Sequence, residues 1–195
     1  MAGAVDSDCA VKLFWLPLGA GGHSVRLNGR VYEAVLAAFQ RRTRRDLYHS
    51  ALEVISPEGR YVVEMAPVMD ADVAARGVVA QGPVGSRVLR PWRFFRYEVR
   101  CWRDGTIPDV DEAVDSPQLL SHDAELTERI VQLVRTVPTY VWGRDALGVH
   151  DMWNSNSLTS WLLVSSGVDL TAIRLPPNGR APGWDAGIAA ARHLQ

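Results

Sequence analysis

Residues Asn154 to Ser157 are the part of this chain whose types and spacing come closest to a catalytic arrangement. This Asn-Ser-Asn-Ser run stands directly before Leu158, Trp161 and Leu162, which recur at helical spacing. Asn and Ser side chains accept hydrogen bonds from the free N–H groups at a helix start. The Ser157 hydroxyl would therefore lie in the first turn, near the positive end of the helix dipole. That position suits a nucleophile, and it equally suits an inert helix cap.

His49 is the candidate general base. It belongs to the run Leu47 to Ile55, whose composition predicts a strand. On that strand His49, Ala51 and Glu53 share one face, and the small Ala51 side chain leaves room beside the imidazole. A strand histidine can also be purely structural, so its role depends on what it meets in the fold. If it meets Ser157, it would accept the hydroxyl proton while the helix N–H groups stabilise an oxyanion.

A third group should orient the imidazole, and three glutamates are candidates: Glu53, Glu64 and Glu98. Glu53 is four residues from His49, roughly 13 Å along a strand, which is too far for contact. If Ile55 pairs with Tyr61, Glu64 lies on the face away from His49, and a one-residue bulge would reverse that. The position of Glu98 depends on a strand order that the sequence does not give.

The segment Leu47 to Glu53 resembles the histidine strand of circularly permuted papain-like proteins, the superfamily of the lecithin:retinol acyltransferase relatives. In these proteins a strand histidine precedes an Asn-Cys pair that opens a helix, and Asn156-Ser157 stands where that pair would be. The chain is also similar to an uncharacterised bacterial family with a His-Ser strand, a Tyr-Glu-Val strand, and a proline-to-aromatic lead into Asn-Ser-Asn-Ser/Thr. Here those features are Tyr97 to Val99, Pro138 to Trp142 and Asn154 to Ser157. The resemblance covers residues 47–178.

The resemblance implies His49 as base and Ser157 as nucleophile, with Asn154 or Asn156 orienting the loop or binding the oxyanion. Serine replaces the expected cysteine, and its hydroxyl needs a well-oriented base because its pKa is far higher than that of a thiol. Two functions therefore stay open. The chain is a hydrolase or acyltransferase acting on a small-molecule, peptide or lipid amide or ester, or it is a catalytically inactive binding or interaction domain.

The elements that would position these residues follow from hydrophobic periodicity. Strands are predicted at residues 11–18, 47–55, 61–65 and 94–102, with a short one at 77–80. Helices are predicted at residues 31–42, 123–134, 154–167 and 184–193, with a short one near 110–114. Strands joined by tight turns favour an α+β fold, an antiparallel sheet flanked by helices. The resemblance implies that this fold is of permuted papain-like type. We expect one domain over residues 1–195, with residues 1–9 as a flexible tail.

The amino-acid composition limits the classes of partner that we expect. With 47% hydrophobic residues, 22% charged residues and a net charge of −1, nothing favours nucleic acid or an anionic membrane. Cys9 and Cys101 form neither a disulfide framework nor a metal-binding spacing, so we expect a cytoplasmic protein without metal or cofactor. No run has the length of a transmembrane helix.

Two further patterns favour plain structural interpretations. The glycine-rich segment at residues 19–24 has serine where a dinucleotide loop needs its third glycine, so we interpret it as a flexible connection. Six arginines recur between residues 87 and 103, and we interpret them as a solvated strand face. They are Arg87, Arg90, Arg93, Arg96, Arg100 and Arg103.

Overall fold

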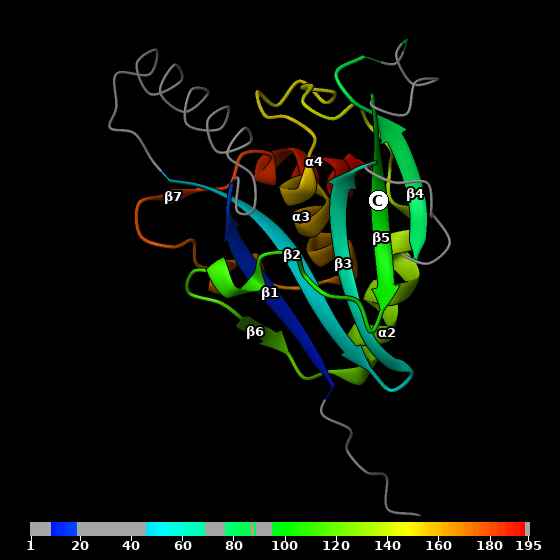
Figure 1. The fold of residues 1–195 in the computed structure, drawn as a ribbon, viewed down its shortest axis with the longest axis vertical. Helices are drawn as coiled ribbons and strands as arrows, with labels where there is room; N and C mark the ends of the chain where they lie inside the picture. Colours follow the sequence, from blue (N-terminus) through cyan, green and yellow to red (C-terminus); the bar gives the residue numbers. More distant parts are fainter. Residues whose placement is uncertain (1–8, 19–45, 69–76, 87, 89–94, 194–195) are drawn as a thin grey trace, which may run out of the picture.

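A computed structural model describes residues 9–18, 46–68, 77–86, 88 and 95–193 of the chain. Its centre is a seven-stranded sheet (Figure 1). The strands are β1 (Ala10–Pro17), β2 (Asp46–Ser56), β3 (Gly59–Pro67), β4 (Val78–Pro83), β5 (Arg96–Arg103), β6 (Gln118–Ser121) and β7 (Gly179–Arg180). Their order is β4-β5-β3-β2-β1-β6, and β7 pairs with the start of β2. All pairings are antiparallel except that of β7 with β2.

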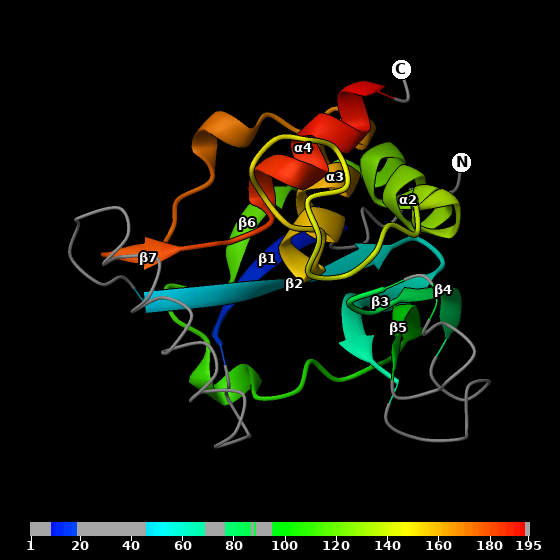
Figure 2. The same cartoon turned by 90° about the horizontal axis from the view of Figure 1, so that it is seen from above.

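Among the described residues, three α-helices cover one face of the sheet, and Figure 2 shows them on the same side. They are α2 (Ala124–Leu133), α3 (Ser155–Ser166) and α4 (Trp184–His193). Helix α3 packs on β2 and β3, and α4 packs on α3. The opposite face is crossed by the segment that contains the 3-10 helix η4 (Val110–Glu112). Two further 3-10 turns, η5 (Val134–Thr136) and η6 (Leu170–Ala172), follow α2 and α3.

The two faces of the sheet carry separate hydrophobic clusters. The larger lies under the helices and contains Leu52, Val54 and Val63 from the sheet with Leu158 and Leu162 from α3. The smaller cluster lies on the other face, and its buried members are Phe14, Leu16, Ala51, Val62 and Ile107. The strands therefore alternate as expected for a sheet covered on both sides. The predicted α+β fold with a helix-flanked antiparallel sheet is confirmed.

The register of the β2–β3 hairpin differs from the expected one. Ile55 pairs with Arg60 and Leu52 pairs with Val63, so the hairpin is one residue tighter than an Ile55–Tyr61 pairing. Because a one-residue shift exchanges the faces of a strand, Glu64 lies on the same side of the sheet as His49. Of the two positions left open for Glu64, the structure has the one on the His49 side.

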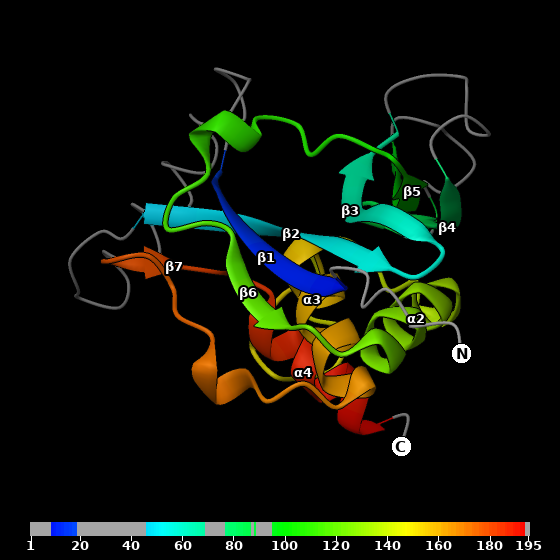
Figure 3. The same ribbon diagram turned by 90° about the horizontal axis from the view of Figure 1, so that it is seen from below.

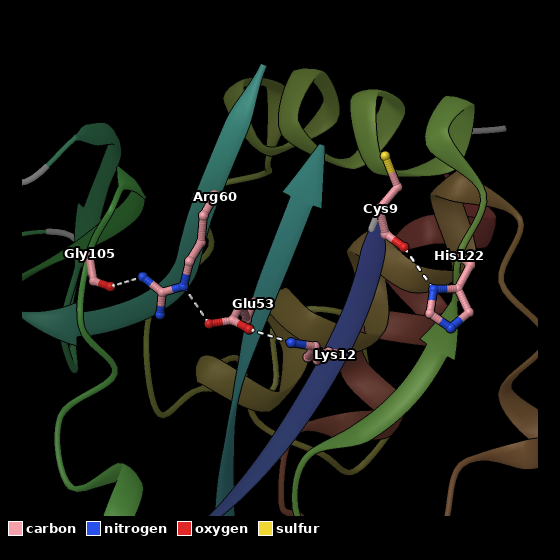
Figure 4. Close-up of polar contacts among 6 residues, drawn as sticks. All are labelled: Cys9, Lys12, Glu53, Arg60, Gly105 and His122. Atoms are coloured by element: carbon pink, nitrogen blue, oxygen red, sulfur yellow. Dashed lines mark hydrogen bonds and ion pairs between the residues drawn. The ribbon is translucent and has the colours of Figure 1, made fainter. Parts of the chain in front are cut away.

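Some other expectations are corrected by the structure, and others concern residues that the structure does not describe. Cys9, expected in the flexible tail, is only 4% exposed, and its carbonyl accepts a hydrogen bond from His122 Nδ1 at 2.9 Å (Figure 4). Strand β6 was not expected, because four residues carry too little periodicity to be recognised. The predicted helix at residues 31–42 and the glycine-rich segment at residues 19–24 lie outside the described residues.

None of the described helices combines the length and the apolar character that crossing a bilayer requires.

Candidate functional site

Ser157 completes a capping box at the start of α3. The Asn154 side chain accepts hydrogen bonds from the N–H groups of Asn156 (2.9 Å) and Ser157 (3.4 Å). In return, Ser157 Oγ accepts from the Asn154 N–H at 3.0 Å. Serine thus takes the place that glutamate or glutamine usually has in this motif. The arrangement satisfies N–H groups that a helix start would otherwise leave without partners.

The Ser157 hydroxyl also acts as a hydrogen-bond donor inside the protein. Its proton can be donated to the Gly183 carbonyl at 2.7 Å or to the Met152 carbonyl at 3.0 Å. The residue is 0% exposed. Gly183 in turn is held by Asp151, whose Oδ1 accepts from the Gly183 N–H at 2.7 Å. A hydroxyl with this burial and these partners cannot reach a substrate unless the helix start opens.

Asn156 closes a gap along one edge of β2. On that edge β7 pairs with Asp46 and Leu47, whereas the described β3 pairing begins only at Leu52. The Leu47 carbonyl bonds to Leu18 on the β1 side, so by strand alternation the next carbonyl, that of Tyr48, points toward the gap.

The Asn156 amide fills this gap. Its Nδ2 donates to the Tyr48 carbonyl at 2.9 Å and to the Pro182 carbonyl at 2.8 Å. Its Oδ1 accepts from Ser50 Oγ at 2.8 Å, and Ser50 Oγ also lies 2.9 Å from Thr159 Oγ1. Asn156 is 1% exposed. Its role in this structure is therefore to attach α3 to the sheet.

His49 lies on the other side of the sheet. Along β2, Ser50 and Leu52 face α3, whereas Ala51 belongs to the cluster on the opposite face. Strand alternation places the His49 side chain with Ala51, and its partner across the β1 pairing is Leu16, from the same cluster. The expected pair of His49 and Ser157 is therefore not formed, because the sheet separates the two side chains.

Burial lowers the pKa of His49 to about 4, although the Asp109 carboxylate acts in the opposite direction. The imidazole is half-buried and neutral at pH 7. Because protonation of the unfolded chain occurs near the ordinary pKa of 6.5, acid favours the unfolded state between pH 6.5 and 4. We expect about 2 kcal/mol of stability to be lost over this range through His49.

A histidine titration followed by NMR checks this directly, with denaturant titrations of the wild type and His49→Gln at several pH values. The variant should lose this part of the pH dependence. A His49 pKa near 6.5 in the folded protein would show that the side chain is solvated.

None of the three candidate glutamates orients His49. Glu53 is bound by Lys12 Nζ at 2.9 Å and by Arg60 Nε at 2.5 Å, and Arg60 also donates to the Gly105 carbonyl at 2.6 Å (Figure 4). Burial raises the pKa of Glu53, but the hydrogen bonds from Lys12 and Arg60 outweigh it and lower the pKa. This buried carboxylate forms ion pairs with Lys12 and Arg60.

Glu64 and Glu98 share a buried arginine instead. Arg100 donates through Nη1 to Glu64 at 2.7 Å and through Nε to Glu98 at 2.6 Å. Glu98 is 0% exposed and Arg100 only 7%. The interpretation of the arginine series as a solvated face was therefore wrong for Arg100. It holds for the exposed Arg103, while Arg87, Arg90 and Arg93 lie outside the described residues.

Ser155 is a functional candidate that the sequence did not single out. The pair that opens the helix is Asn154 and Ser155, two residues earlier than expected, because Asn154 is the N-cap. Ser155 is 6% exposed, and its hydroxyl forms no hydrogen bond with any residue that the structure describes. It therefore keeps the free hydroxyl that Ser157 lacks, but without a histidine bonded to it.

Among all the residues that the structure describes, no group of three or more His, Cys, Asp or Glu side chains could bind a metal ion. Comparison with protein-family models, curated proteins and solved structures gave no match.

Proposed function

We propose that this chain is a catalytically inactive binding or interaction domain, with the resemblance to permuted papain-like proteins reflecting its ancestry. The observation that carries the proposal is the state of the Ser157 hydroxyl, which is 0% exposed and bonded on both its donor and acceptor sides. A serine nucleophile needs a base within hydrogen-bonding reach and access to substrate. Ser157 has neither, and its bonds are those of a helix cap.

The alternative, a hydrolase or acyltransferase with Ser157 and His49, would require the helix start to open and the imidazole to cross the sheet. No observation favours that rearrangement. Both cysteines, Cys9 and Cys101, are buried thiols, and burial raises the pKa of Cys101 to about 11. The thiol state of Cys101 supports the cytoplasmic location expected from the sequence.

A fluorophosphonate probe tests the proposal, because it reacts covalently with activated serines. We expect no labelling of the wild type, Ser155→Ala or Ser157→Ala in intact-mass measurements, under conditions that fully label a serine protease. Labelling that is lost in Ser157→Ala would establish the enzyme. Labelling that is lost only in Ser155→Ala would equally overturn the proposal and would place the nucleophile at the first helical residue.

A further inference from the structure

A cavity lies between β6 and the segment that follows α3. Its volume is about 590 Å³, within the range of small-ligand and peptide pockets. Its lining includes Asp115, Gln118, Leu119, Asp169, Arg174 and Leu175. All of these residues lie outside the α3 start, so the cavity is separate from the candidate site described above.

One wall of the cavity is a sheet edge. Strand β6 is the last strand in the sheet order and pairs with β1 on one side (Figure 3). Within the described residues, no strand pairs with its other side. Because backbone N–H and C=O groups alternate in direction along a strand, such an edge presents donors and acceptors that match another extended chain. This chemistry specifies a peptide backbone rather than an arbitrary small molecule.

The same cavity gathers exposed apolar side chains. Leu119 is 53% exposed and Leu175 is 44% exposed. They are two of the four large hydrophobic side chains that are exposed among the described residues, and both line this cavity. Exposed leucines that converge on one concave site are typical of a binding surface.

The outer wall of the cavity is fixed before anything binds. Gln118 Nε2 donates to the Arg174 carbonyl at 2.6 Å, and Gln118 Oε1 accepts from the Arg174 N–H at 3.1 Å. The Trp15 indole donates to the same carbonyl at 2.9 Å. The backbone at Arg174 is therefore held in place by the side chains of Gln118 and Trp15 without any ligand.

The charges of the lining complement a basic peptide. Asp115 and Asp169 are opposed by Arg174 alone, so these three side chains carry a net charge of −1. Asp169 is exposed, and its carboxylate is kept ionised by bonds from the Thr171 N–H (2.9 Å) and hydroxyl (2.8 Å). An incoming lysine or arginine would find favourable charge at this rim.

We propose that this groove, defined by β6 and residues 168–177, binds an extended segment of a partner protein. The segment adds to the free edge of β6, places an apolar side chain against Leu119 and Leu175, and directs a basic side chain toward Asp115 and Asp169. The proposal deepens the proposed function, on which it rests, by naming the partner's chemistry.

Fluorescence polarisation of the full-length chain with a labelled hexapeptide of alternating leucine and lysine tests this proposal. We expect saturable binding that weakens at least tenfold in Leu119→Asp and severalfold in Asp115→Asn at low salt. Val110→Asp is the matched control, because Val110 is 37% exposed on η4, across the sheet from the helices, and it should leave binding unchanged. A peptide with glutamate for lysine, and one N-methylated at alternate residues, should each bind at least tenfold more weakly.

Three results would overturn the proposed peptide binding at this groove: no saturable binding, equal binding by Leu119→Asp and Val110→Asp, or full binding of the N-methylated peptide. Sedimentation of the protein alone tests the rival occupant, because a dimer that Leu119→Asp dissociates would make this face a contact between copies. Mass spectrometry of the recovered peptide separates the two proposals. Cleavage of the bound peptide would contradict the proposal of an inactive domain but not the proposal of peptide binding. Failure to bind the peptide would contradict only the proposed peptide binding, because the fluorophosphonate experiment does not depend on it.

Discussion

Arg100→Met is expected to lower the free energy of unfolding by about 3–5 kcal/mol, the cost of leaving buried charges without their partner. Arg100 bonds to both Glu64 and Glu98, and Glu98 is fully buried. Without the guanidinium, two carboxylates would face each other inside the protein. A domain of this kind has a total stability of about 5–15 kcal/mol, so the loss is a large part of it.

Denaturant titration at neutral pH measures this effect, and Arg103→Met on the same strand is the control. Arg103 is exposed and donates to the Glu58 carbonyl at 2.8 Å, so its replacement should cost less than about 1 kcal/mol. Adding Glu64→Gln and Glu98→Gln to Arg100→Met should restore most of the loss, because the two buried carboxylate charges disappear. If Arg100→Met and Arg103→Met were equally stable, the cluster would not be buried as described.

Asn156→Ala should destabilise the protein by about 1–3 kcal/mol, because it leaves the buried Tyr48 carbonyl without its donor. The Pro182 carbonyl would also lose a donor but keeps the Asn154 amide. The Ser50 hydroxyl would lose an acceptor but keeps Thr159 as partner. The Tyr48 carbonyl lies at the gap between β7 and β3, and Asn156 is its donor there within the described residues. The substitution should therefore also loosen α3 from β2.

A double-mutant cycle with Ser50→Ala isolates one part of this effect. We expect a coupling energy of about 1 kcal/mol between Ser50 and Asn156, since the two side chains share a 2.8 Å hydrogen bond. Hydrogen exchange at the first turn of α3 should accelerate in Asn156→Ala. A variant as stable as the wild type, with no coupling to Ser50, would contradict the structural role of the amide.

Local pattern predicted most of the elements. Alternation within residues 47–55 and the helical spacing after Asn154 depend on neighbouring residues only, and β2 and α3 end within one residue of the predictions. The cap of α3 was also recognisable from residue types, because Asn and Ser serve free N–H groups in any fold. These features need no knowledge of the tertiary structure.

The arrangement of the candidate site depended on non-local choices. The sequence placed His49 and Ser50 on opposite faces of a strand, but it did not say which face the helix would cover. The helix covers the Ser50 face, so the hydroxyl rather than the imidazole meets Asn156. Likewise, the pairing of Arg100 with Glu64 joins two strands whose order the sequence does not give. Sites formed by residues from different strands are therefore the hardest to predict from local sequence patterns.

The most direct test of the central claim is the free energy of unfolding of Ser157→Ala, measured beside Ser155→Ala. We predict a loss of about 1–2 kcal/mol for Ser157→Ala, because a cap and a buried hydrogen bond are removed, and a change within about 0.5 kcal/mol for Ser155→Ala. Catalytic side chains are often held at a cost in stability, so removing a nucleophile leaves stability unchanged or raises it. A Ser157→Ala variant as stable as the wild type, or more stable, would contradict the structural role of this hydroxyl.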